Sequence, residues 1–326
     1  MKVAVVQGGP SLEAAVSRVS AQAVVSALKS LDHVVSLHEL GPNLAAELLA
    51  EKPDVVFPAV HGAQGEDGCL QGLLEILRFP YVGSGVRGSA GAASKVTTKV
   101  AYRAVGLPVA AERVLRPDDC LVDAQQLFSS IVRELGQRII LKPATGGSAL
   151  GIVRLEPGFT ALDLQTGMAS VLAIDEEVLA EEYVVGAELT CGVLEEGGVP
   201  VALAPTLISA QAAEWYDFKS KYQKGGSRHV CPAPLEPAIT AAIQNAAVLA
   251  HRALGLRDLS RTDFILREDG SFILLETNTL PGMTDVSLFP EAAAVRGIPF
   301  PQLIDSLCLN AKNRGSFVGR PEIAMP

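Results

Sequence analysis

The chain has 326 residues, 48% of them hydrophobic, which at about 150 residues per domain predicts two or three domains and excludes disorder for most of its length. Its mean hydropathy is +0.29. A net charge of −9, from 27 Lys and Arg against 36 Asp and Glu, excludes a general nucleic-acid binder, which needs a basic surface to neutralise phosphates, and leaves small molecules as the expected partners.

The apolar runs and the cysteines predict a cytoplasmic protein with no membrane partner. Residues 1–6 run directly into an apolar strand, without the h-region or cleavage site of a signal peptide. No apolar run reaches the roughly 18–20 uncharged residues of a spanning helix. The five cysteines are scattered and show no Cys-x-x-Cys spacing, so we expect reduced, mostly buried thiols.

Residues 1–84 predict a Rossmann-like α/β domain. Short apolar strands alternate with amphipathic helices, which is typical of a parallel sheet with crossover helices. We expect Ser11 to cap the first helix, whose apolar stripe includes Val16 and Leu28. The expected strands are residues 2–8, 34–37, 54–60 and 81–82, and a short helix is expected at residues 70–77.

Two further domains are expected before a tail at residues 313–326 that frays. Residues 85–182 predict a small α+β domain that begins with a lysine-rich helix, and residues 183–312 predict a second α+β domain. The expected elements are a strand at 138–142, a glycine-rich loop at 144–151, strands at 188–194 and 199–205, a helix at 237–254, a hairpin and a last helix near 301–309.

The most informative stretch is residues 259–278, which predicts a β-hairpin. The dipeptide Asp269-Gly270 between two apolar runs is a strong turn signal, and if it is the turn centre, Asp263 faces Glu276 and Arg261 faces Asn278. Because side chains alternate along a strand, these four share one face. Directly opposed Cβ atoms lie about 4.5–5.5 Å apart, so two carboxylates and an amide oxygen converge beside a guanidinium.

Two opposed carboxylates repel each other unless a positive group lies between them. Hard oxygen ligands of this kind suit Mg²⁺, with Mn²⁺ as the alternative. The competing interpretation is a surface hairpin whose acids are only solvated. The intervening side chains Phe264, Leu266, Ile273 and Leu275 are all apolar, which favours a hairpin that lines a core.

Lysines give the second signal. Lys142 ends an apolar strand just before the glycine-rich loop, so it is well placed to contact phosphates, and the loop could offer backbone N–H groups to them. Lys95 and Lys221, taken singly, are typical solvated cations. The loop matches neither the Walker A pattern nor the dinucleotide fingerprint, and the turn after the first strand fails the latter as well, which argues against a nicotinamide dehydrogenase.

A colinear set of motifs runs along nearly the whole chain. In order they are Gly8-Gly9-x-Ser11, His61-Gly-x-x-Gly-Glu-Asp-Gly68, Lys142-Pro143 with Gly147-Ser148, Tyr216-Asp217 with Lys221-Tyr222, Arg261-x-Asp263, and Glu276-x-Asn278-Thr-Leu-Pro-Gly-Met-Thr284. The set resembles the D-alanine–D-alanine ligases of the ATP-grasp superfamily. It is far more specific for that family than any one of its motifs.

The resemblance implies an ATP-grasp fold, ATP bound between the second and third domains, Mg²⁺ as cofactor, D-amino acids as the other substrates and a homodimer. The implied ATP-binding residues are Lys95, Lys142 and Lys221 at the phosphates, Glu181 and Val184 at the adenine, and Glu188 at the ribose. The implied metal ligands are Asp263, Glu276 and Asn278.

The resemblance also implies a reaction that supplies a dipeptide for peptidoglycan precursors. ATP would phosphorylate the carboxylate of one D-alanine, and the amine of a second would attack the acylphosphate. Arg261 and the backbone N–H of Gly282 would stabilise the oxyanion, while Ser148 and Tyr222 would hold a loop over the closed site. The implied substrate-binding residues are His61 at the first D-alanine, and Ser287 and Leu288 at the second.

The first motif departs from the family at one position. Members typically carry two glutamates after the serine, and Ala15 stands where the second would bind the ammonium of the first D-alanine. Glu13 remains as a candidate substrate-binding residue, but on a helix it would face roughly 200° away and would have to shift. The sequence leaves open whether Glu13, Glu66 or another group receives the ammonium.

Three functions are consistent with these residues. D-alanine–D-alanine ligation leads, because the set of motifs is nearly complete. A related ATP-grasp ligase that joins other amino or carboxylic acids is the alternative that Ala15 suggests. The third is a catalytically silent nucleotide-binding homologue, but such a protein has no chemical reason to keep Arg261, Asp263 and Glu276 together.

Overall fold

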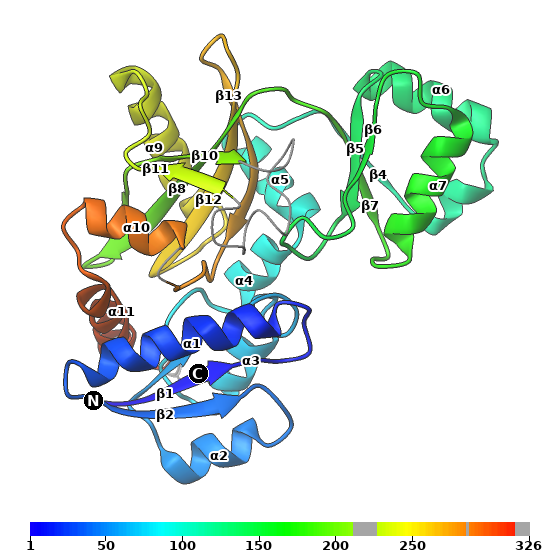
Figure 1. Cartoon of the computed structure of the whole chain (residues 1–326). Helices are drawn as coiled ribbons and strands as arrows, with labels where there is room; N and C mark the ends of the chain where they lie inside the picture. The colour runs from blue at the N-terminus through cyan, green and yellow to red at the C-terminus, as the bar shows by residue number, and fades with distance from the viewer. Residues whose placement is uncertain (211–226, 285–286, 317–326) are drawn as a thin grey trace, which may run out of the picture.

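Three sheets divide the chain into three lobes (Figure 1). The computed structural model describes residues 1–210, 227–284 and 287–316. The first lobe lies at the bottom of Figure 1, the central lobe at the right and the third lobe at the upper left. None of the helices in these ranges combines the length and the apolar character that crossing a bilayer would require.

The first lobe is built on a parallel sheet, as the strand and helix alternation predicts. Its strand order is β2-β1-β3. The elements are β1 (Lys2–Gln7), α1 (Ala14–Lys29), β2 (Val34–Glu39), α2 (Leu44–Glu51), β3 (Val55–Pro58) and α3 (Cys69–Ile76). The strand expected at residues 81–82 is reduced to a single bridge between Val56 and Tyr81.

The start of α1 differs from the prediction. Ser11 is not the N-cap, because Glu13 occupies that position and the helix begins at Ala14. The Ser11 hydroxyl instead donates to the carbonyl oxygen of His61 at 2.6 Å. This bond joins the turn after β1 to the segment after β3, so two candidate site segments lie side by side.

The central lobe is an antiparallel sheet of strand order β4-β7-β5-β6 with two helices packed on it (Figure 1). Its elements are β4 (Glu112–Leu115), a 3₁₀ turn (Pro117–Leu121), α6 (Ala124–Leu135), β5 (Ile139–Pro143), β6 (Val153–Leu155), α7 (Ala161–Leu172) and β7 (Val178–Glu182). The glycine-rich loop connects β5 to β6. The lobe has its own apolar core, which includes Leu115, Ile131 and Val178.

The third lobe contains the largest sheet. The strand order is β11-β10-β8-β12-β13, and β9 pairs with β8. Its elements are β8 (Ala187–Glu196), β9 (Val199–Ala202), β10 (Thr206–Ala210), β11 (Ser227–Val230), α9 (Pro237–Ala253), β12 (Leu259–Leu266), β13 (Phe272–Asn278), α10 (Leu288–Val295) and α11 (Phe300–Arg314). The last helix is longer than the predicted one because it packs along α1 and β3 of the first lobe.

Helices α4 (Val86–Ala93) and α5 (Lys95–Ala104) pack on the third lobe although they precede the central lobe in sequence. Tyr102 is fully buried in one core with α9 and the strands β8, β12 and β13. Its hydroxyl lies 2.5 Å from the hydroxyl of Thr277 on β13. The predicted domain of residues 85–182 therefore includes two helices that pack on the third lobe, since the burial that fixes them is not local in sequence.

The hairpin of β12 and β13 has the predicted register at its functional end. Asp263 pairs with Glu276 and Arg261 with Asn278. The turn is longer than the predicted one, because Leu266 pairs with Phe272 and five residues lie between the strands. A bulge between Asp263 and Phe264 then restores the predicted pairs.

Candidate active site

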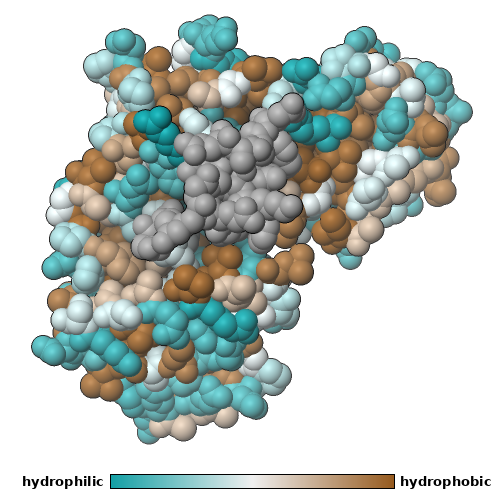
Figure 2. Space-filling view, in the orientation of Figure 1, coloured by the Kyte–Doolittle hydropathy of each residue, from teal (hydrophilic) through white to brown (hydrophobic). Residues whose placement is uncertain are grey.

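A pocket of about 240 Å³ lies where the three lobes meet. The space-filling view shows the surface hollowed between the first and central lobes (Figure 2). Thirteen of the predicted site residues line the pocket: Glu13, His61, Lys95, Lys142, Ser148, Glu188, Arg261, Asp263, Glu276, Asn278, Gly282, Ser287 and Leu288. Glu181 and Val184 are not among the described residues that line the pocket. Lys221 and Tyr222 lie outside the described residues.

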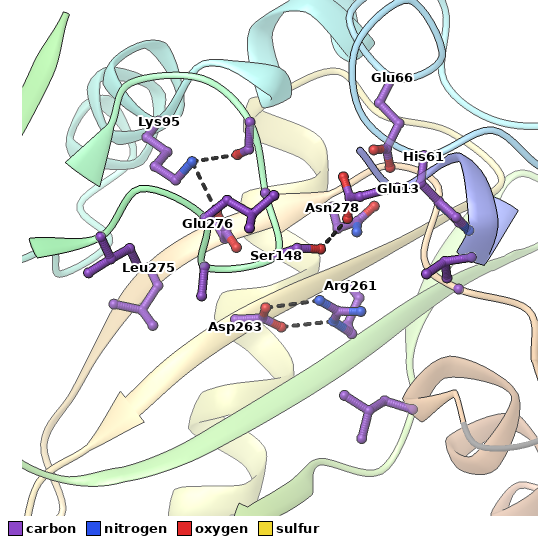
Figure 3. Close-up of a pocket in the computed structure, with 18 of the residues that line it drawn as sticks. Glu13, His61, Glu66, Lys95, Ser148, Arg261, Asp263, Leu275, Glu276 and Asn278 are labelled. Carbon is purple, nitrogen blue, oxygen red and sulfur yellow. Dashed lines mark hydrogen bonds and ion pairs between the residues drawn. The ribbon is translucent and has the colours of Figure 1, made fainter. Parts of the chain in front are cut away.

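The acidic end of the hairpin forms one wall of the pocket (Figure 3). Arg261 donates two hydrogen bonds to the carboxylate of Asp263, from Nε at 2.9 Å and from Nη2 at 3.0 Å. Glu276, which pairs with Asp263 across the strands, lies 3.6 Å from Nζ of Lys95. Both carboxylates therefore already face a cation, which relieves their mutual repulsion.

The donor set of this wall fits a hard divalent cation. Two carboxylates and the amide of Asn278 lie on one face, and the amide oxygen accepts a hydrogen bond from Leu280 N at 2.9 Å, which holds it in place. Among the described residues, no three His, Cys, Asp or Glu side chains group into a metal site of protein ligands alone. Mg²⁺ commonly takes only one or two carboxylates and completes its shell with substrate phosphates and water.

Two lysines form another part of the pocket wall. Lys95 is 8% exposed and donates to the carbonyl oxygen of Gly146 at 2.6 Å (Figure 3). Burial lowers the pKa of Lys95, and the charge of Lys142 adds to this, while Glu276 opposes it. Lys142 lies 2.5 Å from a carboxylate oxygen of Glu181. Phosphate oxygens would supply the negative charge that this wall favours.

The glycine-rich loop has a strained backbone held at its base. Ser148 and Ala149 have φ angles of +56° and +57°, which non-glycine residues rarely adopt. The backbone N–H and hydroxyl of Thr145 both donate to one carboxylate oxygen of Asp175, each at 2.7 Å. Strain of this kind is typical of functional loops whose surroundings hold one conformation.

Glu13 points into the pocket, contrary to the prediction that it faces away. The carboxylate of Glu13, which is 9% exposed, accepts a hydrogen bond from the hydroxyl of Ser148 (Figure 3). The prediction was wrong about which of the two positions faces the pocket, since Glu13, the N-cap of α1, faces it and position 15 does not. Ala15, in the first turn of α1, is exposed. The chain therefore keeps a carboxylate at Ser148.

His61 and Glu66 lie beside Glu13 (Figure 3). His61 is 6% exposed, its Nε2 lies 3.1 Å from the hydroxyl of Ser20, and burial lowers its pKa although the charge of Glu13 opposes this. Burial and the charge of Glu13 raise the pKa of Glu66 to about 8. The Gly62 N–H donates to Glu66 at 2.6 Å. At neutral pH, Glu66 is therefore mostly protonated.

Replacing Glu66 by glutamine should remove a pH dependence of folding. The carboxyl has a pKa near 4.5 when unfolded and about 8 when folded, so its stabilising protonation is complete below about pH 4.5 and is lost as the pH rises through about 8. Between about pH 5 and about pH 8, we expect the free energy of unfolding of the wild-type protein to fall by about 3 kcal/mol relative to Glu66→Gln. Urea denaturation at both pH values measures this difference, and parallel pH profiles would contradict the assignment.

The end of the hairpin leads to the residues predicted at the second amino acid. The backbone N–H of Thr284 donates to the hydroxyl of Ser287 at 3.0 Å, and α10 begins at Leu288. A Cβ added at Gly282 would lie 2.8 Å from that hydroxyl, so a larger residue there would displace the Ser287 side chain. The close approach brings the Gly282 backbone and the Ser287 side chain to one side of the pocket.

Sequence reasoning missed Lys99, which is fully buried and forms ion pairs with Glu112 and Glu181. It also missed Asp175, which holds the base of the glycine-rich loop. The spacing of four residues between Lys95 and Lys99 places both on one helix face and could have drawn attention to the second lysine. Nothing in the sequence pointed to Asp175.

Comparisons with known proteins match this chain to one family. Residues 36–84 and 101–309 match the family profiles described as D-ala D-ala ligase N-terminus and D-ala D-ala ligase C-terminus. The D-alanine–D-alanine ligase of Gluconobacter oxydans is 41% identical over 318 residues, which cover 96% of this chain and 100% of the relative. That of Ruegeria pomeroyi is 44% identical over 307 residues, 93% of each chain.

Solved structures give the same result. The D-alanine–D-alanine ligase of Bacillus anthracis complexed with ATP superposes with a TM-score of 0.80 at 26% identity, over 96% of this chain and 98% of that one. The ligase of Coxiella burnetii superposes with a TM-score of 0.80 at 27% identity, over 96% of this chain and 94% of that one. The predicted ATP-grasp fold is confirmed by these structures.

Proposed function

The chain belongs to the D-alanine–D-alanine ligase family, and we propose that it uses ATP to join two D-alanine molecules into a dipeptide for peptidoglycan precursors. The observation that carries this proposal is the pocket itself. It brings lysines suited to phosphates, a carboxylate pair suited to a metal ion, and the bond from Ser148 to Glu13 into one space of about 240 Å³. Assembly into a homodimer stays a prediction.

The nucleotide would lie between the central and third lobes. Lys95, Lys142 and the glycine-rich loop would contact the phosphates, with Lys221 at the terminal one and Glu188 at the ribose. The side chain of Glu181 is turned toward Lys99 and Lys142, so any contact of residues 181–184 with adenine would rest on other groups of that segment. Asp263, Glu276 and Asn278 would hold Mg²⁺, which neutralises phosphate charge when bound.

The amino acids would occupy the part of the pocket nearer the first lobe. Glu13 would pair with the ammonium of the first D-alanine beside His61. ATP would then phosphorylate the carboxylate of that D-alanine. The amine of the second D-alanine, held near Ser287 and Leu288, would then attack the acyl carbon, so that the peptide bond forms as phosphate leaves. Arg261 and the Gly282 N–H would stabilise the oxyanion, and Ser148 and Tyr222 would close the loop against water.

The position of Glu13 weakens the alternative of a ligase for other acids. That alternative depended on the loss of a carboxylate at position 15, but Glu13 supplies one at Ser148. A coupled assay of ADP release with D-alanine, against a panel of D- and L-amino acids and D-lactate, tests the proposal. We expect D-alanine to be the preferred substrate at saturating ATP and Mg²⁺, and no turnover with it would overturn the proposal.

Glu276→Gln tests the metal site. Removing one of two anionic ligands should raise the Mg²⁺ concentration for half-maximal ADP release by about tenfold or more, since a full unit of charge beside the cation is lost. The matched control is Glu268→Gln, an exposed glutamate at the turn of the same hairpin, which should leave the Mg²⁺ requirement unchanged. Equal Mg²⁺ titrations for the two variants would exclude Glu276 as a ligand.

A further inference from the structure

A cluster of charges, buried except for Arg103, lies between α5 and the central sheet. We call Lys99, Arg103, Glu112, Lys142 and Glu181 the lysine–glutamate cluster. Lys99 Nζ lies 3.0 Å from Glu112 and also forms an ion pair with Glu181. Arg103 lies 2.7 Å from Glu112, and Lys142 lies 2.5 Å from Glu181. Among the described residues, three cations therefore surround two carboxylates.

The cluster joins two lobes. Lys99 is on α5, which packs on β13 of the third lobe, whereas Glu112, Lys142 and Glu181 are on β4, β5 and β7 of the central lobe. Glu112 and Glu181 face each other directly across β4 and β7. Opposed like charges destabilise a sheet unless a cation lies between them. Lys99, with no exposed surface, is that cation.

Only one cation of the cluster can reach the nucleotide. Lys142 lines the pocket, whereas Lys99 does not line it and is fully buried. If Lys142 turned to a phosphate, Glu181 would lose one of its two partners and keep Lys99. Without Lys99, the same movement would leave a buried carboxylate with neither lysine, which is strongly unfavourable.

We propose that Lys99 is a positioning residue for nucleotide binding, because it keeps Glu181 neutralised and so allows Lys142 to exchange that carboxylate for a phosphate of ATP. The inference rests on the proposed function for its ligand. Burial raises the pKa of Glu181, but the charges of Lys142 and Lys99 outweigh it and hold the pKa below its ordinary value. Glu181 is thus held ionised by both lysines in this arrangement, and Lys99 is the cation that stays beside it when Lys142 turns away.

Lys99→Met tests this role. Each carboxylate keeps one cation, Arg103 for Glu112 and Lys142 for Glu181, so we expect the variant to fold. The dissociation constant for ADP with Mg²⁺, measured by calorimetry, and the KM for ATP should both rise by about tenfold or more, while kcat and the KM for D-alanine stay within about twofold. Calorimetry with ADP needs no turnover, so its outcome is separate from the identity of the amino acids.

The stability control is Thr98→Val, the neighbouring residue on α5. The buried Thr98 hydroxyl donates to the carbonyl oxygens of Gly91 and Ala92, so its loss should lower the Tm without changing nucleotide affinity. If Lys99→Met also lowers only the Tm and binds ADP as tightly as the wild-type protein, Lys99 is merely structural and the proposal is overturned.

Glu181→Gln provides the decisive background. In the Glu181→Gln background, residue 181 carries no charge that needs a cation when Lys142 turns to a phosphate. Adding Lys99→Met to Glu181→Gln should therefore weaken ADP binding by less than about threefold. This comparison remains available if Lys99→Met alone does not fold. A full loss of affinity from Lys99→Met in the Glu181→Gln background would show that Lys99 does not act through Glu181, and would also overturn the proposal.

Discussion

Arg261→Ala should lower kcat for dipeptide formation by about 10²–10³-fold, because removal of one preorganised oxyanion donor typically costs that much. The guanidinium is fixed by two hydrogen bonds to Asp263, at 2.9 and 3.0 Å, so it needs little reorganisation when charge develops on the substrate. The KM for ATP should change far less, since Lys95 and Lys142, which would contact its phosphates, are left in place. Initial rates of ADP release at saturating Mg²⁺ measure both quantities.

The control for this variant is Arg252→Ala, which removes an exposed arginine near the end of α9. It should leave kcat within about twofold of the wild-type value. ADP binding and the Tm of Arg261→Ala establish that the variant is folded. Unchanged turnover in folded Arg261→Ala would remove Arg261 from the catalytic groups. A wild-type protein that binds ADP but forms no dipeptide would instead be the silent homologue.

The hairpin shows how far the sequence predicts this site. Taking Asp269-Gly270 as the turn centre places Asp263 opposite Glu276, and the pairing is confirmed. The turn is longer than a two-residue connection, and Leu275 is the extra residue of the bulge, so two local irregularities compensate each other in the register. Neither has a sequence signal, because a bulge depends on how the strand packs against its neighbours.

Contacts between distant segments are what the sequence could not predict. The lysine-rich helix reads as the start of the central domain, yet Tyr102 is buried against α9 and β13, because apolar burial decides where a helix packs. The pairing of Lys99 with Glu181 could not be predicted either, because it depends on where α5 packs. The position of Glu13 depended on one local detail, which side of the start of α1 faces the pocket, and helix ends are the least certain part of any such prediction.

Glu13→Ala should lower kcat/KM for D-alanine by about 10²–10³-fold, because the substrate ammonium would lie in a buried pocket without its counter-charge, a loss of about 3–4 kcal/mol. Glu13→Gln separates two effects, since it can still accept the hydrogen bond from Ser148 but carries no charge. If the charge dominates, both variants lose activity with D-alanine. If Glu13 serves only to hold the loop, Glu13→Gln stays active.

Ala15→Glu distinguishes the two placements of the carboxylate. Ala15 is exposed in the first turn of α1, so a glutamate there should point to solvent, leave kcat/KM for D-alanine within about twofold, and fail to rescue Glu13→Ala in the double variant. If position 15 faced the pocket, as expected from the sequence, it would carry the ammonium ligand, and Ala15→Glu would restore activity to Glu13→Ala. Rescue of Glu13→Ala by Ala15→Glu would therefore refute the role of Glu13, whereas its absence supports a donor site whose carboxylate precedes the helix.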